Sequence, residues 1–209
     1  MPLKFGQPPT ASVTGLADDL PRYAEAAGGA AAMQIESARL SAAADRSTDL
    51  FPHEVFALEL DDVRAGLGVS AARPTAWRYL IGAGSALPQA ADVRTEPGGG
   101  YKVEAVRSGS TPIATLRAVQ QLQADPRVQN GSYEIRMLLF PAARLRSLWL
   151  AADTQAPTPG HERDLFYPLN NPQLPTQDPP NVLFDYRGMS EWLVQLAASV
   201  DTKYPETRG

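Results

Sequence analysis

The sequence predicts an α+β protein: a mixed, mainly antiparallel sheet of about five to seven strands, backed by a long N-terminal helix, one central helix and a C-terminal helix. Three segments repeat apolar residues every three or four positions, as helix faces do. Between them lie segments in which apolar and polar residues alternate, as in half-buried strands. Short turns separate several of these strands, and such connections join antiparallel neighbours more often than parallel ones.

The N-terminal region divides into an arm and a helix. Residues 1–15 carry three prolines and no periodicity, so they predict a flexible arm. From residue 16 to 45 the spacing predicts one long helix, in which Gly28-Gly29 allows a bend. The stripe on this helix consists of Leu16, Leu20, Ala24, Ala27, Ala31, Ile35, Ala38 and Ala42. Because most of these side chains are small, whatever packs on the stripe has to approach closely.

The next segment allows two interpretations. Residues 54–61 alternate like a strand, but their apolar positions also fit a helix that ends at Gly66 or Gly68. We favour a strand followed by a short helical turn over residues 61–67. A second strand is then predicted over residues 75–81.

A β-hairpin and a helix follow. Residues 91–96 and 101–107 alternate on either side of Pro97-Gly98-Gly99-Gly100, which predicts the hairpin. The central helix is predicted over residues 112–124, between a Ser-Thr-Pro start and an Asp-Pro stop.

The C-terminal part begins with a strand over residues 133–140. Its second half is apolar at every position, so we expect it to lie in the interior of the sheet. Two further strands, 145–152 and 164–169, are joined by a polar loop over residues 153–163.

The last segment combines irregular chain and a helix. A proline-rich stretch, 170–188, predicts an irregular wrapping segment. Ser190 is the expected N-cap of a final helix that buries Leu193, Leu196, Ala197 and Val200. Residues 205–209 should fray, and residues 16–204 are expected to form a single domain.

Composition narrows the classes of function. The net charge is −4 and no cluster of five basic residues occurs, which argues against a nucleic-acid partner. The chain has no cysteine and no run of eighteen apolar residues, so we expect no thiolate chemistry and no membrane span. A cytoplasmic protein is expected, and the richness in Ala, Arg, Gly and Pro hints at a bacterial source.

Motifs of catalysis are missing from the sequence. A metal site around His53-Glu54, Asp61 and Asp62 is disfavoured because the histidine has no spaced partner. Gly82-Ala83-Gly84-Ser85 lacks the Gly-Lys-Ser/Thr of a phosphate loop, and no Gly-x-Ser-x-Gly motif is present. We therefore predict no catalytic residue, no metal and no cofactor.

Two weaker groups of residues remain as candidates. A carboxylate and histidine site could form near Glu54, Glu59 and His161, and a loop or ligand site could form at His161, Asp164 and Trp149. The predicted strands also carry large aromatic residues, which indicate core more than interface: Trp77, Tyr79, Trp149, Phe166 and Tyr167.

The absence of catalytic motifs favours a non-catalytic protein-interaction or assembly module. The alternatives are an enzyme with the carboxylate and histidine site, or a protein that holds a small molecule in an apolar pocket. The alanine-rich stripe predicts the interface, at Ala24, Ala27, Ala31 and Ile35, and the simplest partner is a second copy of the chain.

Overall fold

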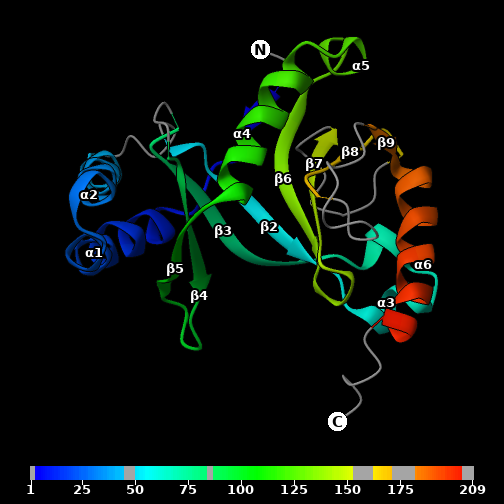
Figure 1. Ribbon diagram of the computed structural model, residues 1–209, viewed down its shortest axis with the longest axis horizontal. Helices are drawn as coiled ribbons and strands as arrows, with labels where there is room; N and C mark the ends of the chain where they lie inside the picture. The colour runs from blue at the N-terminus through cyan, green and yellow to red at the C-terminus, as the bar shows by residue number, and fades with distance from the viewer. Residues whose placement is uncertain (1–2, 45–49, 84–86, 153–161, 171–181, 204–209) are drawn as a thin grey trace. The chain divides into compact units, whose positions relative to one another are not determined.

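Nine strands and the helices that accompany them make an α+β fold, as the sequence predicted (Figure 1). The computed structural model describes residues 3–44, 50–83, 87–152, 162–170 and 182–203. For residues 201–203 it describes the backbone only. The strands are mainly antiparallel. Their number exceeds the predicted five to seven because β1 (Leu3–Phe5) and β9 (Phe184–Asp185) are too short to show an alternation in the sequence.

The chain groups into two compact units, which are described separately. The N-terminal unit comprises Phe5–Val55 and Thr75–Gln120. The C-terminal unit comprises Met1–Lys4, Phe56–Pro74 and Gln121–Gly209. The single-domain organisation stays a prediction.

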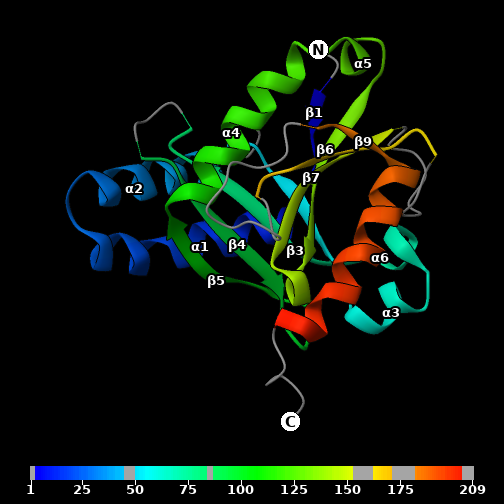
Figure 2. The same ribbon diagram turned by 45° about the vertical axis from the view of Figure 1, so that its right-hand side comes forward.

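The N-terminal unit contains a pair of helices where one long helix was predicted. Helix α1 (Thr10–Ala27) and helix α2 (Gly29–Ala43) fold back against each other (Figure 2). Gly28 and Gly29 both adopt positive φ, of 66° and 52°, and this left-handed backbone ends one helix before the next begins. The prediction of one helix over residues 16–45 was therefore wrong. Helix α1 also starts inside the range predicted as an arm.

The sheet of this unit follows the order β5-β4-β3-β2. Strand β3 (Arg73–Ile81) pairs with β4 (Gln89–Thr95), and β4 forms the predicted hairpin with β5 (Tyr101–Ser108). Strand β2 (His53–Ala57) contributes His53–Val55 to this unit. The helix pair packs on one face in a core of Leu16, Leu20, Ile35, Ala38, Ala42, Tyr79, Ile81, Ala91, Val93 and Val103.

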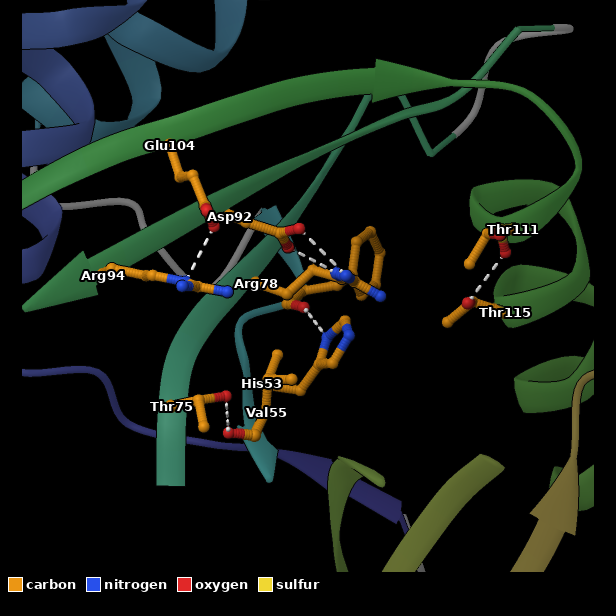
Figure 3. Close-up of polar contacts among 10 residues, drawn as sticks. His53, Val55, Thr75, Arg78, Asp92, Arg94, Glu104, Thr111 and Thr115 are labelled. Carbon is orange, nitrogen blue, oxygen red and sulfur yellow. Dashed lines mark hydrogen bonds and ion pairs between the residues drawn. The ribbon is translucent and has the colours of Figure 1, made fainter. Parts of the chain in front are cut away.

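Helix α4 (Ser110–Gln123) confirms the predicted central helix. Its Thr111 and Thr115 lie on the side of the sheet that carries Arg78 and Asp92 (Figure 3). A short helix, α5 (Pro126–Gln129), follows where a stop was predicted, and the side chain of Asp125 caps it by accepting the N–H of Arg127.

The strands of the C-terminal unit confirm the prediction for residues 133–140. Strand β6 (Tyr133–Phe140) pairs along its whole length with β7 (Leu145–Ala152). Strand β8 (Leu165–Pro168) pairs with β7, β9 pairs with β8, and β1 pairs with β6. Leu58 N–H also donates to the carbonyl of Leu139, so β6 is interior and buried on both faces.

Helices cover the core of this unit. Helix α3 (Leu60–Arg64) is the predicted helical turn, and 3₁₀ turns occur at Gly68–Ala71 and Pro141–Ala143. Helix α6 (Tyr186–Lys203) buries the four predicted apolar residues beside Trp149 and Phe166.

The start of α6 corrects two predictions. Helix α6 begins four residues before the predicted cap Ser190. The side chain of Asp185 caps it instead, because its Oδ1 accepts the Gly188 N–H at 2.7 Å. Strand β9 and the first three residues of α6 also fall inside the segment 170–188 that was predicted to be irregular. Residues 171–181 and 204–209 lie outside the described residues.

In the described part of the chain, no helix has the length and apolar character needed to cross a bilayer.

Candidate functional site

Two of the residues predicted to form a loop or ligand site do lie together, but as a buried pair. Trp149 Nε1 donates to Asp164 Oδ2 at 2.8 Å, and the Ala152 N–H donates to Asp164 Oδ1 at 2.8 Å. Phe166 stacks on Trp149 with ring centroids 5.8 Å apart. Asp164 thus ties the end of β7 to the aromatic core. The third predicted residue, His161, lies outside the described residues.

The two predicted carboxylates belong to different units. Glu54 is half-buried on β2 in the N-terminal unit, whereas Glu59 is exposed at the start of α3 in the C-terminal unit. Among the described residues, no group of three or more His, Asp or Glu side chains is arranged to hold a metal ion.

The residues predicted as an interface mostly pack within the chain. Ile35 is buried in the core of the N-terminal unit and Ala24 packs against it. Ala31 is half-buried, and its carbonyl accepts a weak hydrogen bond from Gln89 Nε2 at 3.4 Å. Only Ala27 is exposed, at the end of α1. The stripe therefore lies mostly where α1, α2 and the sheet pack against one another.

A different face of α2 is exposed and apolar. Met33 is 75% exposed and Leu40 is 52% exposed, and two small residues of the helix and its C-cap residue share their side. We call this face the α2 seam; it consists of Ala30, Met33, Ser37, Leu40 and Ala44. The spacings of 3, 4, 3 and 4 are those of the a and d positions of a coiled coil. The side of α2 opposite the seam carries Ile35 and Ala42, which are buried, so this helix is apolar on both sides.

The second unusual feature is a buried polar cluster in the same unit. It lies on the face of the sheet opposite the α1–α2 pair. It consists of His53 on β2, Arg78 on β3 and Asp92 on β4 (Figure 3). Arg78 and Asp92 are almost fully buried, and the guanidinium holds the carboxylate at two points, Nε to Oδ1 at 2.6 Å and Nη2 to Oδ2 at 3.0 Å. This geometry leaves the third guanidinium nitrogen, Nη1, without a hydrogen-bond partner.

His53 is completely buried beside this ion pair. Its Nδ1 lies 3.0 Å from the carbonyl oxygen of Phe51, and since a carbonyl only accepts, Nδ1 carries the proton. Burial, followed by the positive charge of Arg78, lowers the pKa of His53 to about 4. The ring is therefore neutral at pH 7, and its Nε2 presents a lone pair that has no partner.

A threonine of α4 and an exposed ion pair lie on the same side of the sheet as the cluster (Figure 3). Thr115 of α4 is buried, and its hydroxyl donates to the carbonyl of Thr111 at 2.9 Å, which leaves the hydroxyl oxygen able to accept. Toward the rim of the same face, Arg94 and Glu104 form an exposed ion pair with an Nε to Oε2 distance of 2.7 Å.

No protein-family model, curated protein or solved structure matches the chain.

The α2 seam and the polar cluster were not predicted from the sequence, although each leaves a trace in it. The 3-4 spacing of the α2 seam can be found in the sequence. The interface was predicted instead on the longer stripe, on the opposite side of the helix. Arg78 and Asp92 each sit between apolar neighbours on a strand, at positions where a charge is unusual. Their pairing could not be foreseen without the register that places them opposite each other.

Proposed function

We propose that the chain is a non-catalytic assembly module whose α2 seam packs against the α2 seam of a second copy. The observation that carries this proposal is the exposure of Met33 and Leu40 on a helix whose other side is already buried. Leaving the two large apolar side chains of the α2 seam in water is unfavourable. Covering them on association recovers that free energy.

The sizes of the side chains favour an antiparallel arrangement. The a positions of the seam are small (Ala30, Ser37 and Ala44) and the d positions are large (Met33 and Leu40). In a parallel pair, a faces a and d faces d, which would oppose large to large and leave gaps between small residues. In an antiparallel pair a faces d, so each large side chain meets a small one. The seam is thus complementary to a reversed copy of itself.

The charges beside the seam fit the same arrangement. Glu36 and Arg39 lie on one flank of the seam and pair with each other along the helix. In an antiparallel pair this flank meets the same flank of the second copy, so Glu36 of one copy comes near Arg39 of the other. The two flanks that meet then each bring one acidic and one basic side chain, so no like charges need to be buried.

The size of the contact sets the expected strength. One helix of 15 residues from each copy makes a small interface. Interfaces at the low end of the size range are weak and reversible. We therefore expect a dimer that dissociates on dilution, with a dissociation constant in roughly the micromolar range.

Sedimentation equilibrium of wild-type protein and seam variants tests the proposal. Met33→Glu and Leu40→Glu should each shift the protein to monomer, because a dimer would bury an unpaired carboxylate. Val194→Glu is the matched control: Val194 is an exposed apolar residue on another helix, α6, and is 47% exposed. This variant should dimerise like the wild type.

Two results would overturn the proposal. One is a wild-type protein that stays monomeric up to several hundred micromolar. The other is a dimer that Met33→Glu and Leu40→Glu leave intact, which would place the interface elsewhere.

A further inference from the structure

We infer that the buried polar cluster of His53, Arg78 and Asp92 is a binding site for the hydroxyl group of a small, uncharged molecule. This inference is independent of the proposed assembly, because it concerns a different part of the N-terminal unit. It starts from hydrogen-bond satisfaction: buried polar atoms in folded proteins nearly always have a partner. Among the described residues, three buried side-chain nitrogen or oxygen atoms lack one, and two of them belong to this cluster.

The two atoms are complementary to a hydroxyl. Arg78 Nη1 can only donate, and His53 Nε2 can only accept, because the proton of the ring is on Nδ1. A hydroxyl group both accepts and donates through one oxygen, so it can take the N–H of Arg78 and give its proton to His53 Nε2. A group that only donates or only accepts would leave one of the two atoms unpartnered.

The charges of the cluster select an uncharged ligand. Arg78 and Asp92 neutralise each other through two hydrogen bonds, and the His53 ring is neutral, so the cluster has no net charge. An anion would lie close to the carboxylate of Asp92, and a cation would lie close to the guanidinium of Arg78. Either would lose its hydration in a buried site without a free counter-charge.

The backbone fixes the histidine in this orientation. Phe51, whose carbonyl receives Nδ1–H, has a positive φ of 46°, a conformation that is costly for a bulky residue. The ring of Phe51 packs edge-to-face on Phe5, with 4.8 Å between the ring centroids. The strained residue thereby keeps the protonated nitrogen turned away and the accepting nitrogen available.

The same chemistry could be supplied by an ordered water or by an organic hydroxyl compound, and the experiment separates the two. Protein labelled with ¹⁵N-histidine is titrated with methanol, ethylene glycol and glycerol, and separately with acetate and methylammonium. The ¹⁵N shift of His53 Nε2 is recorded. Free ¹⁵N-histidine in the same buffer is the reference for bulk solvent effects.

We expect at least one of the alcohols to move the His53 Nε2 signal along a saturable curve, and the two ions to leave it unchanged. Arg78→Lys should weaken that response at least tenfold, while Arg107→Lys, an exposed arginine on β5, should retain it. The wild-type titration decides alone if Arg78→Lys does not fold. Alcohol shifts that stay linear and parallel those of free histidine would mean that water alone occupies the site, and they would overturn the inference. Saturation by acetate or methylammonium would overturn it as well.

Discussion

Arg78 and Asp92 stand directly opposite each other in the register of β3 and β4, and join through two hydrogen bonds of 2.6 and 3.0 Å. The register turns two isolated charges of the sequence into a neutral, buried pair. Such a pair contributes little net stability while it is complete, but losing one partner leaves the other charge buried and uncompensated.

Asp92→Ala should therefore destabilise the protein by about 3 to 5 kcal/mol. Glu104→Ala removes the acidic partner of a similar but exposed arginine, Arg94, and should cost less than about 1 kcal/mol. Urea unfolding of both variants measures the difference. Equal losses would show that Arg78 is as well solvated as Arg94.

His53 predicts a dependence of stability on pH. Its pKa is about 4 in the folded protein against an ordinary 6.5, so the unfolded chain binds the proton more readily. The contribution is complete above pH 6.5, falls as the pH drops toward 4, and amounts to about 3 kcal/mol in total. Free energies of unfolding measured at pH 7.0, 5.5 and 4.5 should decrease in that order. His53→Gln should flatten the decrease, and an unchanged slope would contradict the assignment.

Ser12 and Tyr79 form a buried hydrogen bond between two hydroxyls, 2.8 Å apart, that joins α1 to the sheet. Burial raises the pKa of Tyr79 to about 12. Ser12→Ala and Tyr79→Phe should each lower the free energy of unfolding by about 1 to 3 kcal/mol. Each variant removes one hydroxyl and leaves the other one buried without its partner. The double variant should cost less than the sum of the two, and additive losses in this cycle would argue against the bond.

Gly15 marks the closest approach of α1 to strand β5. A methyl group at this position would lie 2.4 Å from the carbonyl oxygen of Tyr101. Gly15→Ala should therefore destabilise the protein by about 1 to 3 kcal/mol despite the better helix propensity of alanine. Gly100→Ala is the control, since a methyl group there meets its nearest atom at an ordinary 3.7 Å. Thermal unfolding should separate the two variants clearly.

Much of the fold was predictable because local signals agree with the final structure. Strand β6, the β4–β5 hairpin and helix α4 each show a clear period with turn residues at their ends, and all three are confirmed. The helix over residues 16–45 was wrong because its apolar period continues unbroken across Gly28-Gly29. A period shows which residues share a face, but it does not show whether the chain runs straight or turns back. Two glycines in left-handed conformation decide that.

The candidate sites were less predictable because they depend on contacts between distant residues. Trp149 and Asp164 were singled out together and do touch, but only the structure shows that they are buried in the core. From the sequence, His53 was considered as a metal ligand. Its burial beside Arg78 gives it another chemistry, that of a neutral hydrogen-bond acceptor.

Cross-linking between single cysteines at chosen seam positions tests the antiparallel α2 pair most directly, since the natural chain has no cysteine to confuse the result. In the antiparallel pair, a positions of one copy face d positions of the other. The two copies of Ser37 then lie within about 6 Å of each other along the helix axis, and the two copies of Ala30 at least about 15 Å apart. With a short bis-maleimide, Ser37→Cys should form covalent dimers efficiently, Ala30→Cys much less, and Val194→Cys no more than random collision produces. Equal cross-linking at positions 30 and 37 would contradict the antiparallel arrangement, and a level at both positions no higher than at 194 would contradict the seam itself.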